Sequence, residues 1–264
     1  MRRLTMVVMA AALSACASDS EDDVVPPTTP SNSGVVFDSL PATLPPSVTS
    51  ENLQANRIDE FGELVTLSST TAVSAASATV VLVTYGGYAP GELTPDGVTS
   101  TVFQPVPAYS WPITINLFDP ASLVTLATRT QTFNIPARPP ADPSCSNYQW
   151  LSSEGCKAGY AFTVTFDLSG ATLPSSFVYG ITYDTQSAGQ HPTGNVVHSN
   201  KLNVGLFTYS VTPTVGSFTG VTATGTIYLN GQNSFPYKGT GTPGSFGPDT
   251  NWPYHLGVRF NKVE

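Results

Sequence analysis

The sequence predicts an all-β fold, an antiparallel β-sandwich of about nine or ten strands, and three observations support this prediction. Apolar and polar residues alternate in several short runs, as they do in strands with one buried face. Turn-forming pairs such as Ser169-Gly170 and Asn230-Gly231 separate these runs. Helical periodicity is scarce, and neither a βαβ pattern nor an internal repeat is found. A closed β-barrel is the alternative architecture.

Residues 1–15 have the features of a secretory signal peptide. Arg2 and Arg3 come first, and an apolar stretch follows that is too short to cross a hydrocarbon core of about 30 Å. The next residues, Leu-Ser-Ala before Cys16, resemble the lipobox of bacterial lipoproteins. This resemblance implies that the Cys16 thiol is acylated and that Cys16 becomes the first residue of the mature chain. Ordinary cleavage that leaves a free thiol is the alternative.

Residues 16–34 are predicted to form a disordered tether, because they carry acids and prolines and little that can be buried. Their acids, Asp19, Glu21, Asp22 and Asp23, lie close to the lipid end. In some bacteria such acids form a surface-export signal, whereas a solvated linker is the simpler interpretation. We therefore expect an exported protein, anchored by lipid to a bacterial membrane, at the cell surface or the outer membrane.

Residues 35–264 are predicted to form one β-rich domain. The strongest strand patterns fall at residues 78–85, 113–118, 161–168 and 202–207. Weaker patterns fall at residues 61–67, 124–135, 177–183, 223–229 and 254–260. The best helix candidate is residues 50–61, and Asn230-Gly231 suits a hairpin turn between two strands.

The charge of the chain excludes some partners. Loss of residues 1–15 leaves eight Lys and Arg against eighteen Asp and Glu, a formal charge of −10 with neutral histidines. Such a chain repels nucleic acid and anionic lipid headgroups, so neither is expected to bind the folded domain. Charged residues make up only 11% of the chain, and Thr, Ser, Gly and Pro fill the difference, as in extracellular β proteins.

The chain has three cysteines, and a lipid on Cys16 leaves Cys145 and Cys156 as a pair. In an oxidising compartment this pair predicts a disulfide, worth roughly 3 kcal/mol on the chain-entropy estimate. A metal site is the alternative, but no histidine lies nearby to complete a zinc ligand set. Trp150, inside the closed loop, is expected to pack against the bridge.

A group of segments is distinctive: residues 61–62, 79–85, 111–119, 131–139, the Cys145…Trp150…Cys156 loop with Gly159, and residues 163–168, 177–185 and 192–194. These segments resemble an uncharacterised family of secreted bacterial β-sandwich proteins. The resemblance covers most of residues 60–230 and implies an extracellular sandwich module. Some members carry a C-terminal sorting tail, whereas this chain ends at Phe260-Asn261-Lys262-Val263-Glu264 without an apolar tail, which is consistent with an N-terminal lipid anchor. The resemblance brings no catalytic residue.

Motifs for catalysis are weak. Residues 239–244 match G-x-G-x-x-G, but Pro243 inside the motif and Pro248 after it favour a loop over a dinucleotide site. His191 and His198 with Asp184 form a candidate metal or acid–base group, against a solvated polar loop as the alternative. Glycoside hydrolysis needs a pair of carboxylates, and the candidates are Asp119, Glu154, Asp167 and Asp184. These acids lie near strand ends, where roles in turns and caps also explain them.

Aromatic residues give the sharpest binding hypothesis. Rings at strand ends and in loops can stack on sugars, or they can close the ends of the core. The candidate ligand contacts are Tyr85, Tyr88, Tyr109, Trp111, Trp252 and Tyr254. No cofactor is expected; structural calcium held by loop oxygen atoms is left open, without a defined ligand set.

These features favour a non-enzymatic envelope lipoprotein that binds a glycan or another envelope protein. A secreted hydrolase acting on polysaccharide is the second hypothesis. A purely structural assembly partner is the third. No catalytic residue is nominated.

Overall fold

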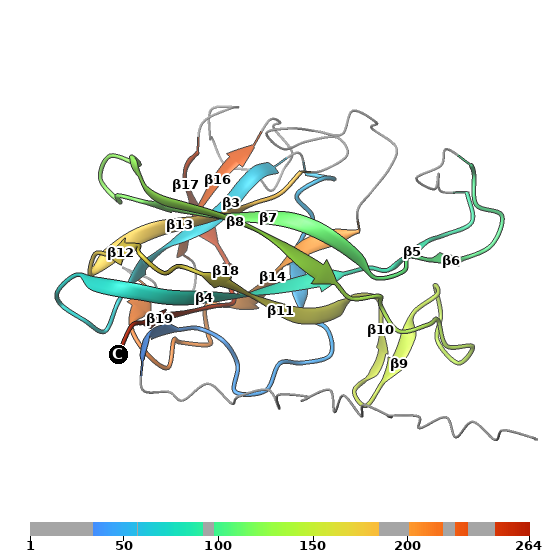
Figure 1. Ribbon diagram of the computed structural model, residues 1–264. Helices are drawn as coiled ribbons and strands as arrows, with labels where there is room; N and C mark the ends of the chain where they lie inside the picture. Colours follow the sequence, from blue (N-terminus) through green and yellow to red (C-terminus); the bar gives the residue numbers. More distant parts are fainter. Residues whose placement is uncertain (1–33, 57, 92–97, 185–200, 219–224, 232–245) are drawn as a thin grey trace, which may run out of the picture. The chain divides into compact units, whose positions relative to one another are not determined.

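The computed structural model describes residues 34–56, 58–91, 98–184, 201–218, 225–231 and 246–264. Within these ranges the regular elements are all strands, and the predicted all-β fold is confirmed. The strands lie in two main antiparallel sheets, neither closed into a barrel, as in a β-sandwich (Figure 1). The described strands belong to one compact unit, Ser33–Glu264. Among the described residues there is no helix with the length and apolar character to cross a membrane.

The first main sheet has eight strands and is built around the long strand β4. Its members are β1 (Val35–Asp38), β2 (Thr49–Glu51), β4 (Val73–Thr84), β11 (Tyr160–Asp167), β12 (Thr172–Leu173), β14 (Leu202–Thr208), β18 (Tyr254–Leu256) and β19 (Val258–Lys262). All eight residues of β11 pair with β4, and β19 and β14 pair with successive parts of β4.

The second main sheet has seven strands in the order β17-β16-β3-β13-β7-β8, with β15 also paired to β3. Its members are β3 (Ile58–Thr66), β7 (Tyr109–Phe118), β8 (Thr125–Ile135), β13 (Ser176–Thr182), β15 (Ser217–Phe218), β16 (Gly225–Gly231) and β17 (Gly247–Trp252). Strand β8 pairs with β7 alone and forms one end of this sheet. Two further hairpins pair β5 (Gly87–Tyr88) with β6 (Gln104–Pro105) and β9 (Trp150–Ser152) with β10 (Gly155–Lys157).

All nine strand patterns found in the sequence fall on strands of the structure, the last of them divided between β18 and β19. The described residues contain nineteen strands, more than expected. The additional ones are short, from two residues in β5 to six in β17. Runs this short carry too few alternating residues to be recognised in a sequence.

The predicted helix at residues 50–61 is wrong. Its ends belong to β2 and β3, and residues 53–56 between them form a turn in which the amide of Asn56 donates to the carbonyl of Asn52 at 3.1 Å. Glu51 pairs with Val204 of β14, so long-range pairing overrides the weak local helix preference.

The predicted hairpin turn at Asn230-Gly231 is also wrong. Both residues lie at the end of β16 and pair with β3, with a register irregularity between them. The antiparallel partner of β16 on the other side, β17, begins only at Gly247. The backbone freedom of Gly231 therefore serves an irregularity in the ladder rather than a two-residue turn.

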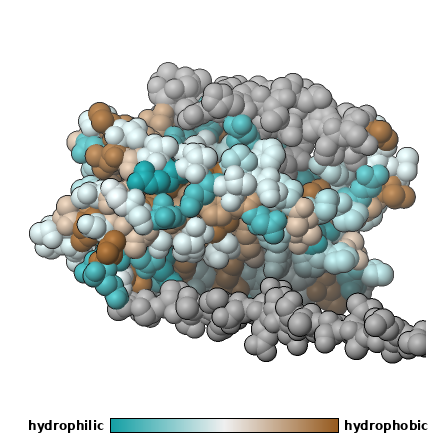
Figure 2. Space-filling model, viewed as in Figure 1, coloured by the Kyte–Doolittle hydropathy of each residue, from teal (hydrophilic) through white to brown (hydrophobic). Residues whose placement is uncertain are grey.

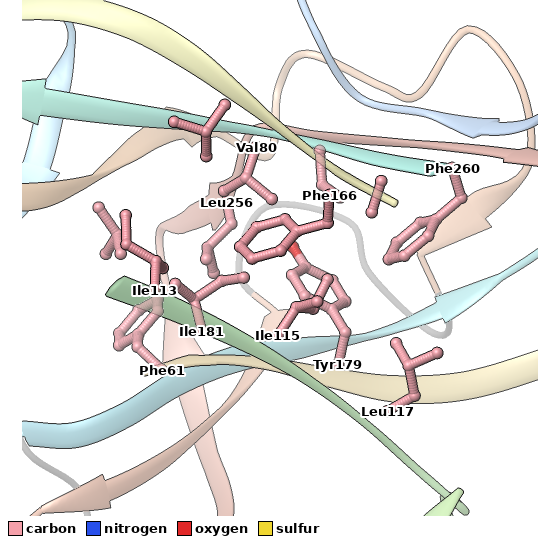
Figure 3. Close-up of a cluster of buried hydrophobic side chains, with 14 of the residues drawn as sticks. Phe61, Val80, Ile113, Ile115, Leu117, Phe166, Tyr179, Ile181, Leu256 and Phe260 are labelled. Atoms are coloured by element: carbon pink, nitrogen blue, oxygen red, sulfur yellow. The ribbon is translucent and has the colours of Figure 1, made fainter. Parts of the chain in front are cut away.

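The core lies between the two main sheets. Phe166, Leu256 and Phe260 enter it from the eight-stranded sheet, and Phe61, Ile115 and Tyr179 from the seven-stranded sheet (Figure 3). The Phe260 ring packs edge-on against the rings of Phe177 and Tyr179, with centroids 5.0 and 5.5 Å apart. Such edge-to-face contacts between the two sheets add to the stabilisation from apolar burial.

The predicted disulfide is confirmed: Cys145 is bonded to Cys156, with Cα atoms 5.6 Å apart. Trp150 lies inside the closed loop, is buried, and donates through Nε1 to the carbonyl of Gly159 at 3.0 Å.

Candidate functional site

The outer face of the seven-stranded sheet carries a hollow of about 440 Å³, a volume within the range of small-ligand sites. It is lined by Pro112, Thr114, Asn116, Thr128, Thr130, Thr182, Tyr183 and Asp184. Four of these eight residues are threonines, and we call this feature the threonine hollow. Its lining comes from β7, β8 and the end of β13.

Strand pairing explains why these residues meet. Thr182 of β13 pairs with Thr114 of β7, which in turn pairs with Thr130 of β8. In the neighbouring row, Asn116 pairs with Thr128. Because side chains alternate between the faces of a strand, residues two positions apart share the outer face.

Hydrogen bonds run in one direction across the floor of the hollow. Thr128 Oγ1 donates to Asn116 Oδ1 at 2.8 Å, and Asn116 Nδ2 donates to Glu60 Oε1 at 2.8 Å. Thr114 Oγ1 and Thr130 Oγ1 lie 2.7 Å apart. The hydroxyl proton of Thr128 is therefore used within the protein, and its remaining lone pairs are available as acceptors.

Glu60 reaches Asn116 across Gly180, which is the β13 residue between them. A Cβ atom at Gly180 would lie 2.2 Å from Glu60 Oε1, so no larger residue fits while the carboxyl group stays in place. Gly180 pairs with Asn116 on one side and Gly62 on the other. The missing side chain leaves the space that the carboxyl group occupies.

The environment of Glu60 shifts its protonation. The residue is only 4% exposed, and burial raises its pKa from 4.5 to about 7, assisted by the negative charge of Asp59 and opposed by the hydrogen bond from Asn116. A carboxyl group next to a polar hollow therefore changes charge near neutral pH.

A second carboxyl group, that of Glu63, lies on the opposite side of the same strand. Glu63 is 1% exposed and accepts hydrogen bonds from the Tyr209 hydroxyl and from the backbone amide of Leu256. Burial raises its pKa well above the ordinary value. Because Tyr209 and Leu256 belong to the part of the chain around β14 and β18, Glu63 links the two sheets through the interior.

Sequence reasoning missed Glu60, Asn116 and the threonines. The usable signal was three acids, Asp59, Glu60 and Glu63, within the nine residues of β3. Acids are depleted in strands, and buried carboxyl groups are rare without partners.

The six aromatic candidates are buried or half-buried. Tyr88 is buried, the Tyr85 hydroxyl lies 2.9 Å from Ser50 Oγ, and Trp111 Nε1 donates to the carbonyl of Asp184 at 3.2 Å. The structure brings Tyr109 and Trp111 together, with ring centroids 6.0 Å apart. Trp252 and Tyr254 lie apart from them in sequence, on β17 and β18, and pack against the core. Their role in ligand contact stays a prediction.

Three of the acid candidates serve at turns or in an ion pair. Asp119 Oδ1 accepts hydrogen bonds from Ala121 and Ser122, and Asp167 Oδ1 accepts one from the amide of Ser169, so each caps a turn. These bonds lower the pKa of both groups. Glu154 forms an ion pair with Lys157 at 3.3 Å. Asp184 is the one that lines the threonine hollow.

His191, His198 and the glycine motif at residues 239–244 lie outside the described residues. His255 is fully buried, and its Nδ1 lies 2.9 Å from the Leu256 carbonyl. In the part of the chain that the structure describes, no three His, Cys, Asp or Glu side chains gather as metal ligands. Calcium binding therefore stays a prediction without a ligand set.

Comparisons of the chain with protein-family models, with curated proteins and with solved structures find no match.

Proposed function

We propose that this protein is an exported, lipid-anchored β-sandwich that binds a neutral carbohydrate in the threonine hollow. The observation that carries the proposal is the directed series of hydrogen bonds from Thr128 through Asn116 to Glu60. This series fixes the polar groups of the hollow before a ligand arrives, which reduces the ordering cost of binding.

The chemistry of the hollow favours a ligand rich in hydroxyl groups. The exposed hydroxyls of Thr128 and Thr130 can exchange hydrogen bonds with sugar hydroxyls, whereas Asn116 and Thr182 are buried and bonded within the protein. Asp184 in the lining, Glu60 behind Asn116 and the formal charge of −10 all disfavour an anionic ligand. Tyr183 is the aromatic residue of the described lining, next to Asp184.

A glycan array with neutral oligosaccharides tests the proposal. The protein used is the full chain carrying Cys16→Ser, so that no acyl chain is present. Thr128→Val keeps the shape of the side chain and removes one hydrogen bond, so we expect affinity to fall about 3- to 10-fold. Thr163→Val, which alters an exposed threonine on β11 of the other sheet, is the matched control and is expected to bind normally. Equal binding by both variants would contradict the assignment of the site.

Hydrolysis of a polysaccharide is the second candidate, and the Glu60 pKa of about 7 favours it, because a general acid works best near the ambient pH. Asp184 would supply the second carboxylate that glycoside hydrolysis needs. Release of reducing ends, abolished by Glu60→Gln, supports this candidate. Binding without turnover by the unaltered site contradicts it.

The lipid anchor is tested separately by fractionation of the producing cells. Because acyl chains on Cys16 would hold the chain in the membrane fraction, Cys16→Ser is expected to release it. An unchanged distribution of the variant would refute the anchor while leaving the binding proposal intact.

A further inference from the structure

We propose that two copies of this chain associate through β8, by antiparallel pairing centred on Thr130. The inference rests on the exposed edge of β8 and on the order of its side chains. It does not depend on the identity of the ligand.

Strand β8 is a long edge with a free side. It has eleven residues and pairs with β7 in regular register from Tyr109–Ile135 to Leu117–Ala127. Among the described residues, one hydrogen bond from outside this ladder reaches the β8 backbone. Arg129 Nη1 donates it to the Thr128 carbonyl, at 2.9 Å. The other outward N–H and C=O groups of β8 are available to another strand.

The other edges of the two sheets are shorter or protected. Strands β1 and β18 have four and three residues, and β17 contains Pro248. The eight-residue edge of β11 is partly covered, because Gln131 Oε1 accepts the amide of Asp167 at 2.9 Å and Arg129 donates to the Ser169 carbonyl at 3.0 Å. Side chains of β8 thus shield β11. Strand β8 itself contains no Pro or Lys, two residues that natural edges use against pairing, and its one charged side chain, Arg129, is bonded to the Thr128 and Ser169 carbonyls.

The sequence of β8 is compatible with pairing to itself. A two-fold axis at Thr130 places Thr128 opposite Thr132 of the second copy and Arg129 opposite Gln131. Arg129, the one charged residue of β8, then does not lie opposite Arg129 of the second copy. A shift of one residue, centred on Arg129, would place two guanidinium groups opposite each other, which is unfavourable. The register centred on Thr130 spans the whole strand, with the irregularity between Thr125 and Ala127 at each end of the joint ladder.

Such pairing also extends the threonine hollow. Thr128 and Thr130 line the hollow from β8, so the second copy would contribute its own Thr130 and Thr132 beside them. Thr128, Thr130 and Thr132 are all exposed in the single chain, so a second copy can reach them. Two hollows would lie on one continuous sheet.

Solution mass is the first test, using the full chain carrying Cys16→Ser. We expect light scattering to show twice the monomer mass with rising concentration. Thr130→Lys places two ammonium groups at the two-fold axis and is expected to keep the protein monomeric. Thr163→Lys on β11 is the control for added charge and is expected to dimerise as the parent does. A parent that stays monomeric, or a dimer lost only in Thr163→Lys, overturns the proposal.

Cross-linking tests the register. Directly opposed residues have Cβ atoms about 4.5–5.5 Å apart, close enough for a disulfide after a small adjustment. Thr130→Cys should therefore link two copies under mild oxidation, whereas Thr128→Cys and Thr132→Cys should not link alone but should link when mixed. If the Thr130→Cys variant forms no cross-link, the proposed register is wrong. A monomeric parent that instead binds a synthetic peptide of residues 125–135 would show strand addition by another partner and would also overturn pairing of two copies.

Discussion

Glu60 and Glu63 are three positions apart on one strand, yet they face different surroundings because side chains alternate along β3. Glu63 faces the interior and meets Tyr209, whereas Glu60 faces the outer surface and meets Asn116. Burial raises the pKa of both groups. Glu60, with a pKa of about 7, changes charge near neutral pH beside the threonine hollow.

Glu60→Gln should make the protein more stable at alkaline pH. The folded-state pKa of Glu60 lies above its ordinary value of 4.5, so its contribution to stability is complete below about pH 4.5 and is lost as the pH rises through about 7. Glutamine keeps an acceptor for Asn116 and carries no charge. At pH 8 we expect the variant to exceed the parent by up to about 3 kcal/mol in free energy of unfolding, with little difference at pH 4. Denaturant titrations at both pH values measure this.

Asp119→Asn is the control for this measurement, because hydrogen bonds lower the Asp119 pKa and reverse the sign. The stabilisation from Asp119 is present above its ordinary pKa and is lost as the pH falls through the lowered value. That variant should therefore be less stable than the parent at pH 8, not more. A Glu60→Gln difference that does not change between pH 4 and pH 8 would contradict the assigned protonation.

At the scale of elements, the β9–β10 hairpin shows how a small piece is held in place. Two strands of three residues are too small to be stable alone. The Cys145–Cys156 bridge closes the segment, and the buried Arg138 donates to the carbonyls of Tyr148 and Ala158 at 2.8 and 3.0 Å. The Arg138 guanidinium also lies 5.2 Å from the centroid of the Phe103 ring, which stacks on Tyr148. Arg138 therefore connects the segment before β6 to the disulfide loop.

Removal of the disulfide by Cys145→Ala with Cys156→Ala should lower the free energy of unfolding by roughly 3 kcal/mol. The loss arises because the unfolded chain gains freedom, so the two-sheet core should remain. Hydrogen exchange is expected to rise most in β9 and β10, which depend on the bridge, and little in β4. Ser144→Ala, in the same loop, is the control. An equal rise in exchange throughout both sheets would show that the bridge supports the whole fold.

At the scale of the molecule, the two sheets share one apolar interior. On the side where β8 and β11 lie, the described surface is pale to hydrophilic with scattered hydrophobic residues (Figure 2). Inside, Phe260 of the eight-stranded sheet contacts Phe177 and Tyr179 of the other sheet. This cluster makes the stability of each sheet depend on the other.

Phe260→Ala should destabilise the molecule as a whole. Loss of a fully buried ring and the cavity left behind typically cost about 3–5 kcal/mol. Because Phe260 contacts both sheets, both are expected to unfold in one transition at lower denaturant. Near- and far-ultraviolet circular dichroism should give coincident curves. Leu151→Ala, at a side chain that is 53% exposed, is the control and should change little. Separate transitions for the two signals would contradict a shared core.

The sequence by itself determined the local structure and the covalent link. Alternation along residues 78–85 or 113–118 is enough to predict strands, because one face of each strand must be apolar wherever the sheets pack. The disulfide followed from the number of cysteines. Where local preference was weak, as at residues 50–61 and at Asn230-Gly231, long-range pairing decided the outcome and the prediction was wrong.

Only the tertiary structure decided which residues meet. Glu60, Asn116, Thr128 and Gly180 lie on four different strands and come together through the order and register of the sheet. Register depends on pairing between distant segments, and a slip of one residue would turn every side chain to the other face. The same applies to β8, whose alternating pattern marks it as a strand but does not show that it lies at a free edge. The candidate site and the proposed surface for association are therefore properties of strand order, which local periodicity does not encode.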